Sequence, residues 1–121
     1  MCKRCVRSRV SWSPCVRRGD IYEFRPATAA GGHEQQGKRF GVIVQSDVFL
    51  PRSTVLVAPT STSARPSTFR PEIEFHGAVT RVLVEQMGAV DSSRLGNLAG
   101  RLDANEQWAV DDALLTVLDL R

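Results

Sequence analysis

The sequence predicts a small α+β protein in which an antiparallel β-barrel is closed by a C-terminal helix. A chain of 121 residues has room for one hydrophobic core. Between residues 21 and 102 it holds five or six short apolar stretches separated by polar loops with glycine or proline. Residues 103–118 have the spacing of an amphipathic helix. Short strands followed by one helix favour a small barrel or a strongly bent sheet.

Each predicted strand is bounded by residues that interrupt a ladder. Residues 21–24 alternate apolar and polar, and Pro26 follows them because proline cannot continue a ladder. Residues 54–58 are valine-rich, and we expect that strand to stop at Pro59. The predicted strands are 21–24, 40–45, 54–58, 72–75, 80–87 and a short last one at 98–102.

The connections are polar. Glycines indicate a long loop at 27–38, and hydroxyl groups dominate a second loop at 60–67. We expect a helical turn within 47–53, a turn at 76–77 and an Asp-initiated turn or short helix at 91–95.

Residues 103–118 predict the closing helix. Asp103 is placed to cap its N-terminus, and Glu106 completes a capping box three residues later. Apolar side chains then recur at i, i+3, i+4, i+7 and i+8, so one face of the helix should pack on the sheet. These side chains are Val110, Ala113, Leu114, Val117 and Leu118.

The charge is distributed unevenly along the chain. The net charge is +3, but residues 1–18 hold six basic and no acidic residues, while the other 103 hold ten basic and thirteen acidic residues. Any nucleic-acid binding by the main part of the chain must therefore come from a local patch. We interpret residues 1–16 as a basic, disordered leader and residues 17–121 as one domain.

All three cysteines, Cys2, Cys5 and Cys15, lie in the predicted leader. The first two have the C-x-x-C spacing of a metal knuckle, but a structural zinc site needs four ligands and no second close pair follows. We therefore predict reduced cysteines, no metal and no cofactor. No apolar run reaches the roughly 18 residues of a membrane span, and no signal peptide is indicated, so we expect a cytoplasmic protein.

Polar groups that suit phosphodiester chemistry lie at the ends of three predicted strands. They occur within 33–39, 60–63 and 81–85. If these strands are neighbours, the groups converge at one edge of the sheet, and alternation puts Arg81 and Glu85 on the same face. The alternative is that the charges are solvated or simply pair with one another.

The residue types fit metal-free cleavage of a phosphodiester. Arg39 can hold phosphate oxygens with two N–H groups and stabilise charge in the transition state. Thr60 or Ser61 can donate to the same oxygens. Glu85 can accept the proton of a 2′-hydroxyl, and His33 can serve as acid or base.

Five blocks of sequence also stand in the order of a known family. They are RGDIY at 18–22, GHEQQGKR at 32–39, VLVAPTS at 55–61, VLVEQ at 82–86 and an Asp-x-x-Arg-Leu segment at 91–95. Together they resemble the MazF/PemK/Kid toxins over about residues 17–120.

The resemblance implies an SH3-like (CcdB/PemK-type) antiparallel barrel with a C-terminal helix, a homodimer and a MazE-like antitoxin as partner. It also implies a toxin of a type II toxin–antitoxin system that inhibits translation. Such a toxin is a sequence-specific, metal-independent endoribonuclease that cuts single-stranded mRNA by 2′-hydroxyl attack and leaves 2′,3′-cyclic phosphate and 5′-hydroxyl ends. By position, the implied catalytic residues are Arg39, Thr60 and Glu85, and the implied RNA contacts are His33, Gln36, Lys38, Phe40, Ser61 and Arg81.

Two departures from the family pattern leave the general acid unassigned. The family usually has Arg-Pro after the loop, whereas this chain has Arg39-Phe40-Gly41, in which Phe40 offers a base-stacking face. Some members carry an arginine where this chain has Leu83, a place that Arg81 could fill. Two alternatives stay open: an inactive member retained for antitoxin binding, and a CcdB-like gyrase-binding toxin, although the chain lacks the aromatic C-terminus on which those rely.

Overall fold

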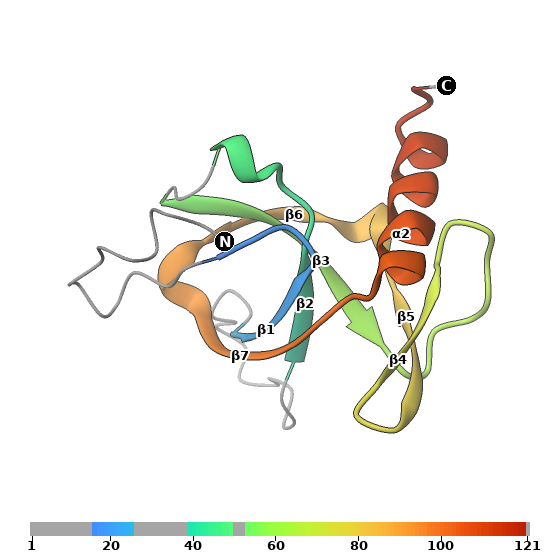
Figure 1. The fold of residues 1–121 in the computed structure, drawn as a ribbon, viewed down its shortest axis with the longest axis horizontal. Coiled ribbons are helices and arrows are strands. Elements are labelled where there is room, and N and C mark those ends of the chain that lie inside the picture. Colours follow the sequence, from blue (N-terminus) through green and yellow to red (C-terminus); the bar gives the residue numbers. More distant parts are fainter. Residues whose placement is uncertain (1–15, 26–38, 50–52, 121) are drawn as a thin grey trace, which may run out of the picture.

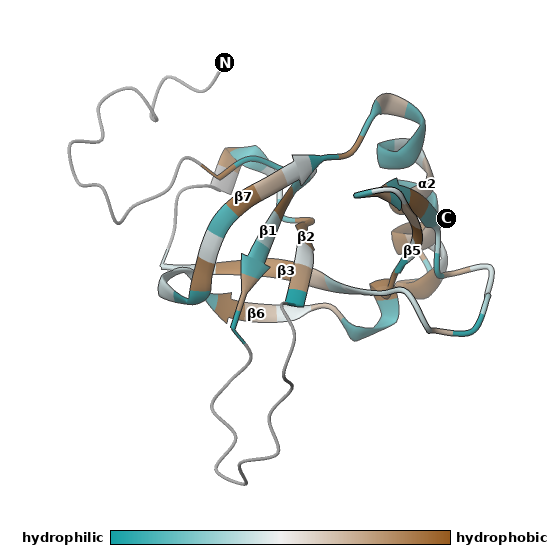
Figure 2. Ribbon diagram, turned by 90° about the horizontal axis from the view of Figure 1, so that it is seen from below, coloured by the Kyte–Doolittle hydropathy of each residue, from teal (hydrophilic) through white to brown (hydrophobic). Residues whose placement is uncertain are grey.

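A computed structural model describes residues 16–25, 39–49 and 53–120, and in it an antiparallel sheet curls into a half-barrel with the helix α2 (Ala104–Val117) beside it (Figure 1). The sheet order is β4-β5-β3-β2-β1-β7, and β6 pairs with β3. Figure 2 shows β7, β1, β2, β3 and β6 wrapping around a common interior. The strands are β1 (Asp20–Phe24), β2 (Arg39–Ile43), β3 (Thr54–Ser61), β4 (Glu72–Phe75), β5 (Ala78–Val82), β6 (Gly88–Asp91) and β7 (Leu95–Arg101).

The predicted antiparallel barrel with a C-terminal helix is confirmed. β1, β2 and β4 lie within two residues of their predicted bounds, and α2 begins and ends within one. The short 3-10 helices η1 (Asp47–Phe49) and η3 (Ser92–Arg94) occupy the segments where helical turns were predicted, and Asp91 caps η3 by accepting from the Ser93 amide.

The predicted end of the third strand at Pro59 is wrong, because β3 continues to Ser61. β3 changes neighbours in this region: it pairs with β6 up to Val57 and with β5 from Thr60. Pro59 falls between the two pairings, so its missing N–H removes no bond from either ladder. The extension matters for the site, since it carries Thr60 and Ser61 on a strand rather than in a loop.

The predicted strand 80–87 is also wrong. β5 ends at Val82, the 3-10 helix η2 (Val84–Gln86) follows, and β6 was not predicted. Val82, Leu83 and Val84 are all buried, which a strand with one solvent face cannot achieve. The Leu83 amide donates to the Pro59 carbonyl at 2.8 Å as the chain turns away from the ladder.

The central strands are buried on both faces. In β2, Val42 belongs to a core cluster that includes Val110 and Ala113 of α2, whereas Ile43 faces a second cluster. Val16, the last residue of the predicted leader, is buried in that second cluster. The helix therefore covers only one side of the sheet.

The start of α2 is fixed by the predicted capping box. The Asp103 carboxylate accepts from the Glu106 amide at 2.7 Å, and the Glu106 carboxylate accepts from the Asp103 amide at 3.0 Å. The second oxygen of Glu106 accepts from the Glu74 amide at 3.0 Å, so the same side chain ties α2 to β4.

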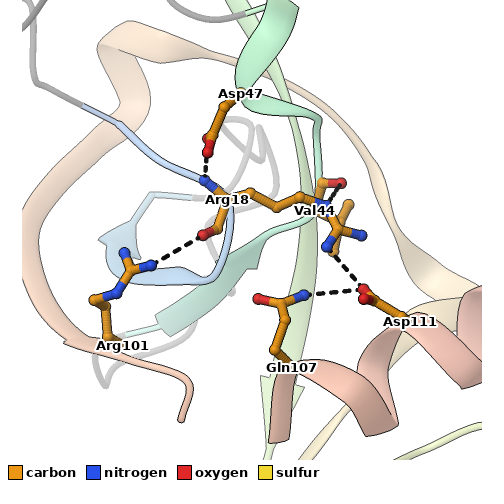
Figure 3. A network of polar contacts seen from close by, with 6 residues as sticks. All are labelled: Arg18, Val44, Asp47, Arg101, Gln107 and Asp111. Atoms are coloured by element: carbon orange, nitrogen blue, oxygen red, sulfur yellow. Dashed lines mark hydrogen bonds and ion pairs between the residues drawn. The ribbon is translucent and has the colours of Figure 1, made fainter. Parts of the chain in front are cut away.

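Arg18 joins several elements at the start of the described chain (Figure 3). Its Nε donates to the Val44 carbonyl at 3.0 Å, and its Nη1 forms an ion pair with Asp111 of α2 at 2.7 Å. Its amide donates to Asp47 at 2.7 Å, and Gln107 donates to Asp111 at 3.0 Å. Arg18, the first residue of the RGDIY block at 18–22, therefore connects the start of the described chain to the end of β2, to η1 and to α2.

Asp20 completes these connections. Its side chain is 5 % exposed and accepts from the Arg17 amide at 2.9 Å and from the Arg101 guanidinium. Burial raises the pKa of the Asp20 carboxyl, although the Arg17 amide and Arg101 act in the opposite direction. Gly19 supplies the positive φ of 92° that the preceding turn requires.

Candidate functional site

A cavity of about 380 Å³ opens where the ends of β2 and β3 meet the hairpin formed by β4 and β5. Four of the predicted site residues line it. The described lining consists of Arg39, Phe40, Thr60, Ser61, Thr62, Phe75, His76, Ala78 and Thr80. The wall therefore combines one guanidinium, four hydroxyl groups and three rings.

β2 positions the first two of these residues. Arg39 is its first residue, and it pairs with Phe24 of β1 in the ladder. Phe40 follows and packs its ring edge-on against Phe75, with centroids 5.0 Å apart. The half-buried Phe40 ring is therefore held by the core on one side while it lines the cavity on the other.

β3 positions the two hydroxyl groups. The Thr60 hydroxyl donates to the Phe40 carbonyl at 3.1 Å, which joins β3 to β2 just beyond the Gly41–Pro59 pair. The Ser61 hydroxyl accepts from the Ser63 amide at 3.1 Å. The Ser61 hydroxyl also lies 3.4 Å from the Ser63 hydroxyl, and either oxygen can be the donor in that contact. Ser61 can therefore turn its proton toward a ligand when Ser63 is the donor, whereas Thr60 must first rotate away from Phe40.

Three rings form the apolar side of the cavity. Phe75 and His76 stack with centroids 3.9 Å apart and an interplanar angle of 19°, and Phe40 contacts the His76 ring edge-on at 5.7 Å. Flat rings beside a guanidinium suit a nucleobase attached to a phosphate.

Glu85 lies in η2 and is not among the residues that line the cavity. Its Oε2 accepts from Nε and Nη2 of Arg70, at 3.0 and 2.7 Å. Burial alone would raise the pKa of the Glu85 carboxyl, but the hydrogen bonds and charge of Arg70 outweigh it and the pKa is lowered. The carboxylate is therefore held by Arg70, away from the other predicted catalytic residues.

Arg81 also lies apart from the cavity, although β5 pairs with β3 as expected. Its Nη2 forms an ion pair with Glu72 at 2.6 Å, and its Nη1 donates to the Ala64 carbonyl at 3.3 Å. Thr80 of the same strand lines the cavity, and consecutive strand residues point to opposite faces, so Arg81 points away. The expected shared face of Arg81 and Glu85 fails because β5 ends between them.

His33, Gln36 and Lys38 lie outside the described residues, as do the three cysteines. Within residues 16–25, 39–49 and 53–120, no group of three or more His, Cys, Asp and Glu side chains is arranged to hold a metal ion. No helix in those ranges is long and apolar enough to cross a membrane.

The cavity includes residues that the sequence patterns did not single out: Thr62, Phe75, His76, Ala78 and Thr80. Thr62 stands in the predicted hydroxyl-rich loop, which was a usable signal. His76 was predicted only as part of a turn, because its contacts with Phe40 join segments 36 positions apart in the chain.

Comparison with known proteins decides the family. The family described as PemK-like, MazF-like toxin of type II toxin–antitoxin system matches residues 17–118. This chain belongs to the PemK/MazF-like toxin family. A relative in Mycobacterium tuberculosis (strain ATCC 25618 / H37Rv), Rv3098A, named as a candidate toxin, is 40 % identical over 106 residues, which cover 87 % of this chain and 99 % of the relative.

Solved structures of toxins share the fold. Mycobacterium tuberculosis toxin MazF-mt6 superimposes with a TM-score of 0.71 at 20 % identity over 84 % of this chain and 98 % of that one. MazE–MazF from Deinococcus radiodurans gives 0.72 at 21 % identity, covering 88 % and 97 %. A mycobacterial endoribonuclease in complex with its cognate antitoxin gives 0.70 at 17 % identity, covering 88 % and 97 %.

Within this family pattern, the departure at Phe40-Gly41 has a packing reason. A Cβ built on Gly41 would lie 2.3 Å from Cγ1 of Val57 and 3.2 Å from the Phe24 ring. The absence of a side chain at Gly41 therefore leaves the space that the Val57 and Phe24 side chains occupy.

Proposed function

We propose that this chain is the toxin of a type II toxin–antitoxin system and acts as a metal-independent endoribonuclease on single-stranded mRNA. The observation that carries the proposal is the convergence of Arg39, Thr60 and Ser61 on one cavity in a member of this family. The fold of a protein described as an endoribonuclease lends further support.

In the proposed reaction, the 2′-oxygen attacks phosphorus as the bond from phosphorus to the 5′-oxygen breaks. The products are a 2′,3′-cyclic phosphate and a 5′-hydroxyl. Arg39 holds two phosphate oxygens and stabilises the added negative charge of the transition state. Ser61 donates a hydrogen bond to the same phosphate, and Thr60 does so after its hydroxyl leaves the Phe40 carbonyl.

The remaining RNA contacts are assigned by residue chemistry. Phe40 presents part of its ring to the cavity and can stack on a base. His33, Gln36 and Lys38 keep their predicted roles in RNA binding. Arg81 and Glu85 are committed to Glu72 and Arg70, so direct roles for them require those pairs to open, and the geometry favours an indirect role.

The proposal includes two protein partners. A homodimer and a MazE-like antitoxin follow from membership of the family, and relatives with this fold include MazE–MazF assemblies from Deinococcus radiodurans. We propose that the antitoxin inhibits the toxin by occupying the cavity around Arg39, so that RNA cannot bind there.

One observation favours a second candidate, an inactive member that binds antitoxin only. Glu85, the predicted base, is ion-paired outside the cavity, and Leu83 stands buried where some members have an arginine. This candidate predicts antitoxin binding of ordinary affinity without RNA cleavage.

The test is to incubate the purified protein with a long mRNA in the presence of excess chelator and to map the cut ends. We expect cleavage at a recurring short motif, with 2′,3′-cyclic phosphate and 5′-hydroxyl ends. Intact RNA at all protein concentrations, together with normal antitoxin binding, would support the inactive candidate instead. Cleavage that stops with chelator would contradict the metal-independent reaction.

A further inference from the structure

The cavity lacks a carboxylate in the part of the chain that the structure describes. Its charged lining residue is Arg39, whose guanidinium donates hydrogen bonds but is not a general acid or base. Its hydroxyl groups can donate hydrogen bonds but are poor proton sources. Among the described lining residues, His76 alone carries an imidazole, the side chain that most often serves in general acid–base catalysis.

His76 is held in place by the turn that joins β4 and β5. It adopts φ of 54°, and Gly77 follows with φ of 79°, as in the tight hairpin turns that favour Asn-Gly. Histidine is enriched at positive φ relative to most residues, but the conformation still restricts the backbone. The turn places the His76 ring on the Phe75 ring. His76 is exposed, so a substrate can reach it.

One ring nitrogen of His76 already has a partner. Its Nε2 lies 3.4 Å from the carbonyl oxygen of Ala99 in β7. A carbonyl only accepts, so Nε2 carries a hydrogen in this arrangement and Nδ1 is the nitrogen that gains or loses a proton. Backbone carbonyls orient catalytic imidazoles in the same manner.

From this geometry we propose that His76 is the general acid of the site. The inference rests on the proposed ribonuclease function. As the 2′-oxygen bonds to phosphorus and the bond to the 5′-oxygen breaks, the His76 imidazolium gives a proton to the departing 5′-oxygen. The proton of the 2′-hydroxyl passes to water, and the neutral imidazole regains a proton from solvent before the next turnover.

A different role for the same ring would be stacking on a nucleobase without proton transfer. Two variants separate these roles. His76→Asn removes the ring but keeps a residue that accepts positive φ before Gly77, so the hairpin is retained. His76→Phe keeps an aromatic ring on Phe75 but has no exchangeable proton.

The experiment uses a short RNA that spans a mapped cut site, made either with the normal 5′-oxygen or with sulfur as the bridging 5′-atom. Sulfur leaves readily without protonation, so it makes a general acid unnecessary. We expect both variants to cut the oxygen substrate about 100-fold or more slowly than the parent chain. On the sulfur substrate the loss should shrink to within about tenfold. Thermal unfolding of each variant confirms that it is folded.

The other outcomes overturn the inference in distinguishable ways. If His76→Phe cuts the oxygen substrate at the parent rate, the ring serves only in stacking. If both variants stay equally slow on the sulfur substrate, His76 acts elsewhere than at the leaving group. If the parent chain cuts neither RNA, the proposed function itself fails.

Discussion

At the scale of residues, burial raises the pKa of Asp20 and of Tyr22. Tyr22 is 4 % exposed and belongs to the second core cluster. Burial, aided by the negative charge of Asp20, raises the pKa of its hydroxyl to about 12 from 10.0. The folded state therefore binds the Tyr22 proton more tightly than the unfolded state does.

This gives a prediction for alkaline pH. Because the folded pKa is raised, the neutral hydroxyl contributes stability that is complete below pH 10 and is lost as the pH rises toward 12, about 2–3 kcal/mol in total. Tyr22 is the only tyrosine, so tyrosinate absorbance reports it alone. If the tyrosinate absorbance has its midpoint near pH 10 while circular dichroism shows a folded chain, the prediction is contradicted. As a control, Tyr22→Phe should remove this part of the pH dependence of stability.

The site residues show which roles the sequence could predict. Arg39, Phe40, Thr60 and Ser61 were predicted from residue chemistry and family blocks, and the structure brings them together. His76 was missed, because a turn signal does not reveal which distant ring it will contact.

At the scale of elements, sequence patterns predicted the bounds of an element correctly where the interactions that fix those bounds lie within a few residues. The capping box at Asp103 and Glu106 lies within four residues and fixed the start of α2 correctly. The end of β3 and the course of 80–87 depend on which strands become neighbours, which no local pattern contains. The expected common face of Arg81 and Glu85 failed for that reason.

The cap allows a matched stability test. Asp103→Ala removes the acceptor of the Glu106 amide and should lower the free energy of unfolding by about 1 kcal/mol. Asn105→Ala changes an exposed residue in the same first turn of α2, where alanine is the better helix former, and should leave stability equal or slightly higher. Urea unfolding of both variants measures the difference. Equal midpoints for the two variants would show that the box contributes little.

At the scale of the whole molecule, the described structure is a single curled sheet with one α-helix packed on one side. The proposed homodimer predicts a solution mass twice the 13.3 kDa of one chain. Light scattering after size exclusion measures this mass directly. A stable mass of one chain at micromolar concentration would contradict the dimer and would place the whole site within a single protomer.

The central claim is that the cavity around Arg39 is the active site of a ribonuclease. The most direct test compares the parent chain, Arg39→Ala, and Arg65→Ala, an exposed arginine that does not line the cavity. The substrate is an RNA of mapped cut site, with or without the 2′-hydroxyl at that position. We predict that the parent and Arg65→Ala cut only the RNA with the 2′-hydroxyl, and that Arg39→Ala is slower by about 100-fold or more. Cleavage by Arg39→Ala at the parent rate would contradict the account.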